Sequence, residues 1–377
     1  MNPLARAKQM VASALFRLLN PSLQQALVPH VETLSRRQNE LQQSLLDLRQ
    51  GLTDRQDHLH RAASLQAESA AQVQLAHQQA MHEEQMLALA DLRLQRLRGE
   101  PNADARAWEF KCFSQWGEDG LLQFLLNRIP GLPRTFVEIG VEDYRESNTR
   151  FLLMHDDWRG LIADSGDRHL RYLETRGLRW RHQIEAVQSF VTRENIETLL
   201  DQAGFQEGLG LLSIDVDGMD YWVWDAVQRH RPAVVAIEYN SLFGCRHALA
   251  VPYADAFDRT AAHPSNLYFG ASLPALAQLA AQKGYRLVCG NAAGNNAFFV
   301  RADLAQGFPV ARPEDVYRPS RFRESRDDQG RLTYVGSMRD RLNLIRHLPV
   351  VDVETGSVRS LDSFDWETAW PEDQSGH

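Results

Sequence analysis

The sequence predicts an α/β fold, a doubly wound sheet of seven strands preceded by a long coiled-coil helix. One observation is an apolar seven-residue repeat that continues through most of the first hundred residues in a single register. The other is the alternation of short apolar runs with helix-like segments afterwards, which indicates a parallel sheet covered on both faces. Together they divide the 377 residues into an amphipathic segment at 1–26, a coiled coil at 27–98, an α/β domain at 105–305 and a C-terminal extension at 306–377.

The repeat between residues 27 and 97 is typical of a coiled coil. Its first core position is occupied by Leu27, Leu34, Leu41, Leu48, Ala62, Ala76, Ala90 and Leu97. Its second core position is occupied by Val31, Leu45, Leu52, Leu59, Val73, Ala80, Leu87 and Leu94. Polar residues interrupt the core at Arg55, Gln66, Ser69 and Glu83, so a single solvated helix or an antiparallel hairpin stays open. Because so long an isolated helix needs a partner, we expect a homo-oligomer formed through the coiled coil.

An apolar helical face precedes the coiled coil. It consists of Met10, Val11, Ala14, Leu15, Leu18 and Leu19. Such a face packs on protein or lies on a membrane surface, so peripheral membrane contact through residues 4–19 stays open. No run of about 18 apolar residues occurs, and Arg17 interrupts the first apolar stretch, so we expect neither a transmembrane helix nor a signal peptide.

The strands of the α/β domain are predicted by apolar, β-branched runs. Four runs expected to be parallel are 135–140, 160–165, 210–218 and 233–240. Helix-like segments separate them at 148–155, 195–203 and 221–230. A helix at 273–284 then precedes two runs, at 285–291 and 295–304, that are close enough to form an antiparallel pair. In the extension, the run at 348–361 predicts a hairpin.

Cysteine usage and charge exclude some classes of protein. Cys112, Cys245 and Cys289 have no paired spacing, which predicts neither disulfides nor a zinc site and favours a reducing cytoplasm. Peripheral attachment to the inner face of the membrane stays open as a location. The net charge is −8, and residues 1–100 carry 11 basic and 10 acidic side chains, so the acidic excess belongs to the remainder. A nucleic-acid partner is therefore not expected.

Acidic and polar residues follow each of the four predicted parallel strands. In strand order they are Glu138 with Gly140, then Asp164, then Asp215, Asp217 and Asp220, then Glu238 with Asn240. In open α/β sheets, ligands bind beyond the carboxyl ends of the strands. Each residue taken alone also suits a turn or a helix cap, but acids at all four strand ends favour a ligand site.

Four segments resemble the FkbM-type branch of the class I S-adenosylmethionine-dependent methyltransferases. They are FSQWGEDG at 113–120, FVEIGVEDYRESNT at 136–149, LLSIDVDGMDYWVW at 211–224 and VVAIEYN at 234–240. The resemblance covers about residues 108 to 302. It implies a Rossmann-like sheet of the class I methyltransferase type, S-adenosylmethionine as cofactor, and transfer of a methyl group to a hydroxyl of a sugar, glycan or related metabolite.

The resemblance also implies a set of cofactor-binding residues, which are Gln115, Glu118, Glu138, Gly140, Asp164 and Ser165. In this assignment Asp164 binds the ribose hydroxyls, Ser165 lies beside the adenosine, and Glu138 with Gly140 lies against the methionine part. The two residues upstream of the first strand also fit an ordinary polar turn. The chain departs from the usual glycine-rich loop, because Val-Glu-Asp-Tyr-Arg-Glu-Ser-Asn follows Gly140.

The catalytic group that we expect is Asp215, Asp217 and Glu238. Alternation along a strand would place Asp215 and Asp217 on one side. Together with Glu238 and Asn240 they offer oxygen ligands for Mg²⁺, which would lower the pKa of an acceptor hydroxyl. Without a metal, Asp217 is the expected general base. The alternative is purely structural, with Asp217 in the strand-to-helix turn and Asp220 capping the helix.

Two other functions stay open from the residues alone. Asp215 and Asp217 also fit the metal-diphosphate motif of a sugar-nucleotide glycosyltransferase, although that motif is short. The second is a non-catalytic scaffold, in which the coiled coil acts and the α/β domain has lost its ligand. The irregular loop after Gly140 keeps this alternative open.

Overall fold

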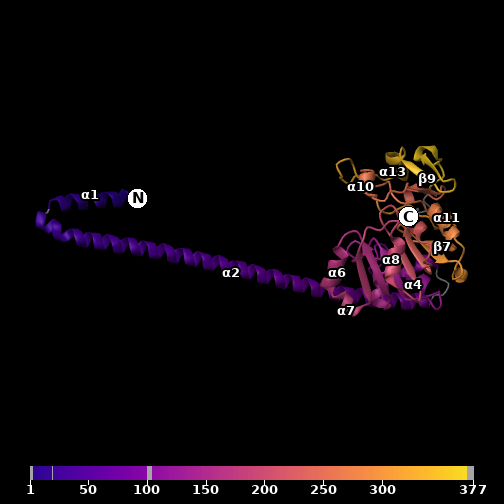
Figure 1. Ribbon diagram of the computed structural model, residues 1–377, viewed down its shortest axis with the longest axis horizontal. Coiled ribbons are helices and arrows are strands. Elements are labelled where there is room, and N and C mark those ends of the chain that lie inside the picture. The colour runs from indigo at the N-terminus through magenta and orange to yellow at the C-terminus, as the bar shows by residue number, and fades with distance from the viewer. Residues whose placement is uncertain (1–2, 19, 100–103, 372–377) are drawn as a thin grey trace. The chain divides into compact units, whose positions relative to one another are not determined.

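The computed structural model describes residues 3–18, 20–99 and 104–371, and the chain divides into two compact units, Met1–Glu84 and Gln85–His377 (Figure 1). Helix α1 spans Pro3–Arg17, and α2 spans Pro21–Arg98. The predicted long helix is therefore confirmed, and it begins before residue 27 and includes Pro29. Residue 19, at the end of the amphipathic segment 4–19, lies outside the described residues.

The leucine seam of α2 is exposed over most of the first unit. Six leucines of the repeat have 62–66% of their surface exposed, namely Leu34, Leu41, Leu45, Leu48, Leu52 and Leu59. The predicted homo-oligomer would cover this seam, and it stays a prediction. Over the described part of the chain, every helix is too short or too polar to cross a membrane.

The last turns of α2 belong to the second unit. Ala90, Leu94 and Leu97 are buried in its apolar core. Arg93 donates from Nη2 to the carbonyl oxygen of Ala107 at 3.0 Å. The globular part therefore begins within the helix, upstream of residue 105, and the final heptads of the repeat pack on the α/β domain.

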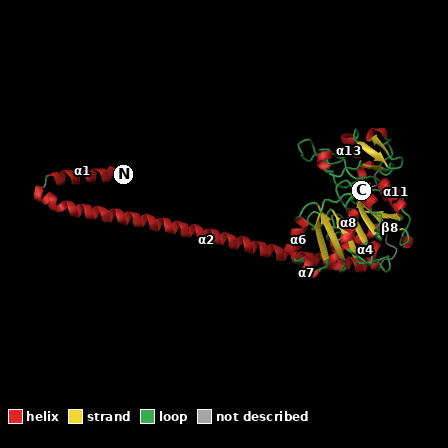
Figure 2. Cartoon of the chain, in the orientation of Figure 1, coloured by secondary structure: helices red, strands yellow, loops and turns green. Residues whose placement is uncertain are grey.

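A seven-stranded sheet forms the centre of the second unit (Figure 2). Its strands are β1 Thr135–Ile139, β2 Arg159–Asp164, β3 Ile184–Gln188, β4 Leu211–Ile214, β5 Val234–Glu238, β7 Tyr285–Gly290 and β8 Asn296–Arg301. The strand order is β3-β2-β1-β4-β5-β8-β7, and β8 runs antiparallel to both of its neighbours. This confirms the predicted doubly wound sheet of seven strands.

Helices cover both faces of this sheet. Those of the second unit, besides the end of α2, are α3 Ala105–Trp108, α4 Glu118–Leu126, α5 Arg150–His155, α6 Arg168–Arg176, α7 Leu178–Arg181, α8 Ile196–Ala203, α9 Asp220–Ala226, α10 Arg259–Ala262, α11 Leu273–Lys283, α12 Pro313–Val316 and α13 Met338–Ile345. Side chains alternate along the strands, so Phe136 packs in one apolar layer and Val137 in the other. The central strands are buried on both faces, as the continuous apolar runs predicted.

The C-terminal extension is built into the same unit. Strands β9 Pro349–Asp352 and β10 Ser357–Ser360 pair antiparallel, which confirms the predicted hairpin. Strand β9 also pairs with β6 Leu249–Ala250. This second sheet joins the extension to the loop region that follows β5.

Candidate functional site

Two adjoining hollows lie beyond the carboxyl ends of the parallel strands. The β3-side hollow has a volume of about 380 Å³ and is lined by Ser165 and by residues 189–192 after β3. The β5-side hollow has a volume of about 590 Å³ and is lined by Gln115, Glu138 and Glu238. Six residues line both, namely Gly140, Asp164, Asp215, Asp217, Arg259 and Glu324. Strand order reverses between β1 and β4, and this switch point is where open α/β sheets bind ligands.

Gly140 brings the ends of β1 and β4 together at the switch point. Its φ is +80°, a left-handed conformation that favours glycine. A Cβ at this position would lie 1.4 Å from the carbonyl oxygen of Asp215, so no other residue fits without displacing the chain. Gly140 therefore lets the backbone at the end of β4 approach the end of β1 closely, and it also borders both hollows.

Asp164 orders the loops that follow β1 and β2. Its Oδ2 accepts a hydrogen bond from the amide of Glu142, and its Oδ1 accepts one from the amide of Gly166, both at 2.8 Å. Each carboxylate oxygen has a second lone pair, so the half-buried side chain can still accept from a ligand hydroxyl. Ser165, next in the chain, is exposed and lines the β3-side hollow.

Residues after β3 complete the β3-side hollow, and the sequence analysis missed them. Phe190 lines this hollow with 51% of its surface exposed, and Ser189 and Thr192 lie beside it. Strand β3 was not among the predicted runs because its sequence, IEAVQ, mixes polar and apolar residues. The signal available was its alternation of apolar Ile184 and Ala186 with polar Glu185, which is typical of a partly exposed strand.

Glu138 lines the β5-side hollow but is largely engaged by the protein. Its Oε1 accepts from the amide of Asn148 at 2.8 Å. Its Oε2 accepts from the hydroxyls of Ser147 and Thr149 and from the amide of Thr149. Burial raises the pKa of Glu138, and these hydrogen bonds oppose that rise. The side chain therefore anchors residues 147–149 of the loop that follows β1.

Glu118 does not line either hollow, contrary to its predicted cofactor contact. It is fully buried, and its Oε2 accepts from the two backbone amides that precede it, both at 2.9 Å. Its Oε1 accepts from the Nδ2 atoms of Asn291 at 2.6 Å and Asn296 at 3.0 Å. Four protein donors thus occupy the carboxylate, which fixes the turn that presents Gln115 to the β5-side hollow.

Asn240 is likewise not part of the acid cluster, so its predicted role as a metal ligand is wrong in this arrangement. Its Oδ1 accepts from the amide of Leu242 at 3.0 Å, which caps the short helical turn Ser241–Phe243. Its Nδ2 donates to the carbonyl oxygens of Leu267 and Phe269 at 3.0 Å. Asn240 therefore has the structural role of a cap residue, which was the alternative to a ligand site.

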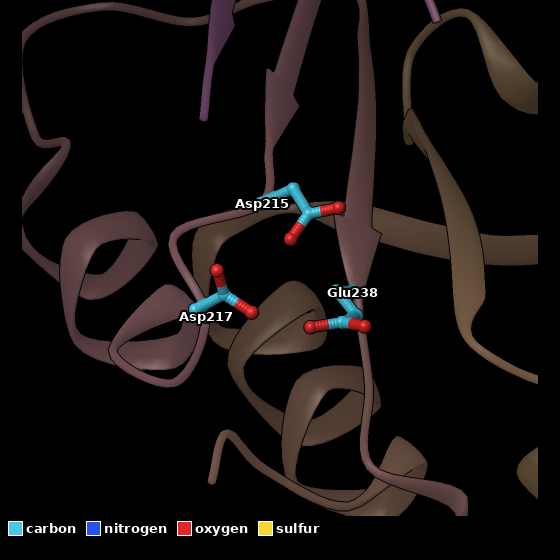
Figure 3. Close-up of side chains that lie close together, drawn as sticks. All are labelled: Asp215, Asp217 and Glu238. Atoms are coloured by element: carbon cyan, nitrogen blue, oxygen red, sulfur yellow. The ribbon is translucent and has the colours of Figure 1, made fainter. Parts of the chain in front are cut away.

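The structure brings Asp215, Asp217 and Glu238 together (Figure 3). One carboxylate oxygen of each lies within 4.8 Å of the others. The prediction that strand alternation places Asp215 and Asp217 on one side was wrong. Strand β4 ends at Ile214, and the chain turns at Asp217, where φ is +54°. The turn, rather than strand alternation, points the two aspartates at each other.

Asp220 holds that turn in place. Its Oδ1 accepts from the amide of Val216 at 2.8 Å, and its Oδ2 accepts from the amide of Gly218 at 3.1 Å. Burial is the main cause that raises the pKa of Asp220 to about 6. The structural alternative placed Asp217 in a turn, which is observed, but its helix cap at Asp220 is not. Asp220 is the first residue of α9, and it holds the turn instead.

The acid cluster is electrostatically strained. Burial, followed by the charge of Asp217, raises the pKa of Asp215 well above its ordinary value. Burial, followed by the charge of Asp215, does the same for Glu238. Among the described residues, Glu238 Oε2 has no hydrogen-bond partner. Such a group keeps a proton or attracts a cation.

Arg259 faces the cluster, and nothing in the sequence singled it out. Its Nη1 lies 3.3 Å from Oδ1 of Asp217, and its guanidinium carbon lies 3.9 Å above the ring centroid of Phe269. The arginine side chain is 16% exposed. It therefore supplies a partly buried positive charge that offsets part of the repulsion among the acids.

The chain has weak similarity to known proteins. No family model matches it, and no curated protein matches it. Among solved structures, it is similar to an O-methyltransferase family protein from Burkholderia thailandensis, with 11% identity, TM-score 0.30, and coverage of 48% of this chain and 56% of that chain. It is also similar to the CurJ carbon methyltransferase, with 8% identity, TM-score 0.33, and coverage of 52% and 57%.

A further similar structure is the O-methyltransferase NcsB1 from neocarzinostatin biosynthesis, solved with S-adenosylmethionine and 2-hydroxy-5-methyl naphthoic acid. Its identity is 17%, its TM-score is 0.28, and the alignment covers 48% of this chain and 55% of that chain. The chain thus spans little more than half the length of each of these three proteins.

Proposed function

We propose that this chain is an S-adenosylmethionine-dependent O-methyltransferase that acts on a hydroxyl group of a sugar, glycan or related metabolite. The observation that carries the proposal is the pair Gly140 and Asp164 at the switch point, where both border two adjoining hollows. Two joined hollows suit two ligands that must meet. The β3-side hollow would take the nucleoside and the β5-side hollow the acceptor.

The residues around the β3-side hollow fit an adenosine. Asp164 keeps a free lone pair on each oxygen and would accept from the ribose hydroxyls. The exposed ring of Phe190 offers an apolar face to an adenine, and Ser165 lies at the same wall. S-adenosylmethionine supplies a methyl group on a positively charged sulfonium, and acidic side chains around the switch point favour that charge.

The charge of the β5-side hollow opposes a sugar-nucleotide donor. Within the described part of the chain, nine carboxylates line it, namely Glu138, Glu142, Asp143, Glu146, Asp164, Asp215, Asp217, Glu238 and Glu324. Among the described residues, two basic side chains line this hollow, Arg145 and Arg259. A diphosphate would enter a field of its own sign. This charge balance favours methyl transfer over the glycosyltransferase alternative.

The acid cluster would receive the proton of the acceptor hydroxyl. Methyl transfer to oxygen requires loss of that proton, and a carboxylate placed beside the hydroxyl can accept it. Asp215 and Glu238 would share one proton between them, and Asp217, at the mouth and beside Arg259, would face the acceptor. A divalent cation held by the same three carboxylates is the second form of this proposal.

Calorimetric titration with S-adenosylmethionine tests the cofactor assignment. Asp164→Ala is expected to weaken binding about ten- to a hundredfold, because loss of a charged hydrogen-bond partner costs about 1.5–3 kcal/mol. Asp167→Ala is the matched control, because Asp167 forms an exposed ion pair with Arg171 and lines neither hollow. Absence of binding by the parent protein would refute the proposal.

Radiolabelled methyl transfer to a panel of methyl glycosides tests the acid cluster. Asp217→Asn is expected to lower turnover at least about a hundredfold, the usual contribution of a general base, while cofactor affinity stays within about twofold. Treatment with a chelator separates the two forms, since only a metal-dependent enzyme loses activity and regains it with Mg²⁺. Full activity of Asp217→Asn would reduce this residue to a turn former.

We also propose that the first unit assembles as a parallel homodimer or homotrimer. The exposed leucines of α2 support this, since a continuous apolar seam on a helix of this length is stable in water once it is covered. The polar residues Arg55, Gln66, Ser69 and Glu83 would set the register. The apolar face of α1 would then remain for contact with protein or with a membrane surface.

A further inference from the structure

An aromatic pair lines the β5-side hollow together with the acid cluster. Trp116 lies in the loop before α4, and Phe322 lies in the C-terminal extension. Their ring centroids are 6.2 Å apart and their planes are inclined by 22°. Both residues border the hollow, and 38% of Trp116 is exposed. An exposed indole beside a polar cavity offers an apolar surface for a ligand.

The position of Trp116 is fixed by its surroundings. Its amide donates to the buried carboxylate of Glu118 at 2.9 Å. The neighbouring carbonyl oxygen of Gln115 accepts from Lys111 Nζ at 3.0 Å, and the same ammonium lies 2.7 Å from Glu146. The turn is therefore held from both sides, so the indole is presented in a defined place.

Phe322 is held by a buried arginine. Arg341, on α13, is 4% exposed, and its guanidinium spans the chain on either side of the phenylalanine. Nη1 donates to the hydroxyl of Ser320 at 3.0 Å, and Nη2 donates to the carbonyl oxygen of Glu324 at 3.1 Å. The amide of Ser320 also donates to the hydroxyl of Ser241 at 3.0 Å. Burying a guanidinium is costly unless it is well hydrogen-bonded, so this arrangement fixes segment 320–324 against the domain.

The remaining lining of the hollow defines the chemistry of its ligand. Amide side chains of Gln115, Asn148, Asn295 and Asn296 accompany the nine carboxylates. Hydroxyl groups can donate to carboxylate and amide oxygens, whereas phosphate or carboxylate groups are repelled by the carboxylates. A purely aromatic ligand would leave the polar groups unpaired. A sugar ring matches both parts, because its C–H face is apolar and its edge carries hydroxyls.

We propose that Trp116 and Phe322 form the acceptor platform, on which an uncharged sugar ring stacks with its hydroxyl edge toward the acid cluster. Segment 320–324 of the C-terminal extension is then a wall of the acceptor site and determines its specificity, and Arg341 is its positioning residue. This inference rests on the proposed methyltransferase function. It adds that the acceptor is a neutral ring and excludes sugar phosphates and nucleotide sugars.

Saturation-transfer NMR with the full-length protein and bound S-adenosylhomocysteine tests the platform. The probes are methyl glycosides of common hexoses and the corresponding 6-phosphates. Uncharged glycosides are expected to show saturation of their ring C–H protons, and the phosphates are not. Trp116→Ala and Phe322→Ala should each weaken glycoside binding about two- to tenfold, the range for loss of one aromatic contact. Trp180→Ala is the control, because Trp180 is 77% exposed and lines neither hollow.

Calorimetry with S-adenosylhomocysteine accompanies every variant. Cofactor affinity should stay within about twofold for the platform variants and for Arg341→Met, which is expected to weaken glycoside binding through movement of segment 320–324. Trp116→Phe should retain most of the binding, and it carries the test if an alanine variant does not fold.

The outcomes separate the two proposals. Equal binding of glycosides by the parent and by Trp116→Ala, equal binding of the phosphates, or no glycoside binding by a parent that binds the cofactor would each overturn the platform and leave the methyltransferase proposal intact. A parent protein that binds no S-adenosylhomocysteine would overturn both.

Discussion

Replacing Glu238 by glutamine is expected to stabilise the second unit while removing activity. Glu238 is 8% exposed, and one of its carboxylate oxygens lies within 4.8 Å of those of Asp215 and Asp217. Burial and the neighbouring aspartate raise its pKa well above the ordinary value of 4.5. An amide keeps the shape, carries no charge and can donate to the remaining carboxylates.

The sign of the pH dependence follows from the direction of that rise. A carboxyl with a raised pKa in the folded state keeps its proton over a range in which the unfolded chain has lost it. The free energy of unfolding therefore decreases as the pH rises from the ordinary value through the raised one. Below the ordinary value both states are protonated and the penalty is absent. The advantage of Glu238→Gln over the parent should thus be small in acid and grow toward alkaline pH.

Burial is the largest cause of the raised pKa of Glu238 and repulsion within the cluster is the next, so the repulsion gives a scale for the effect. Two unit charges 4.8 Å apart repel by about 3.5 kcal/mol at an effective dielectric constant of about 20. The side chain of Asp217 is 74% exposed and Arg259 lies against it, so solvent and counter-charge reduce the effect to about 1–2 kcal/mol. For a domain of this size the melting temperature should rise by about 2–6 °C.

Thermal unfolding followed by circular dichroism, with chelator present, measures this difference at about pH 5 and about pH 8. Glu142→Gln is the control, because Glu142 lines the same hollow but has a side chain that is 76% exposed. A Glu238→Gln protein that is less stable than the parent at both pH values would refute the reasoning.

Two further predictions concern the helix. Light scattering of the intact chain at micromolar concentration should give the mass of a dimer or trimer, and a monomeric mass would contradict the coiled-coil proposal. Removing residues 1–84 should leave a folded monomer with unchanged cofactor affinity, because the second unit begins at Gln85. Removing residues 1–100 should instead lower the free energy of unfolding of the second unit by several kcal/mol, because Leu94 and Leu97 are lost from its core. Equal melting temperatures of the two truncated proteins would refute this prediction.

The central strands were predictable because burial on both faces leaves a continuous apolar signal. Strands β1, β2 and β5 coincide with their predicted runs to within two residues at each end. Strand β4 was predicted too long, because its last apolar and acidic residues belong to a turn held by Asp220. Strand β3, at the edge of the sheet, has exposed and half-buried positions and therefore lacks that signal.

The candidate site was predictable only where topology alone places residues. Strand ends meet at one edge of a parallel sheet, so the sequence alone placed Asp164 and Glu238 at that edge. Arg259 and Phe322 could not, because they lie on segments whose paths depend on tertiary packing far from the strand sequence. Sequence patterns also did not distinguish Glu118, whose oxygens are occupied by protein donors, from acids that face the cavity.

The acids around the switch point fall into two groups according to the hydrogen bonds they receive. Glu138 and Asp220 accept from backbone amides with both oxygens, so these hydrogen bonds oppose the rise in pKa that burial causes, and the two side chains hold loops. Asp215 and Glu238 lie close together with raised pKa values, and Glu238 keeps a buried oxygen without a partner among the described residues. Asp220 holds the turn that follows Asp215, and Glu238 ends strand β5, so both carboxyls are attached to ordered backbone. A proton or a cation between them would relieve this repulsion, and in the proposed function a hydroxyl that enters the same hollow would give its proton to this cluster.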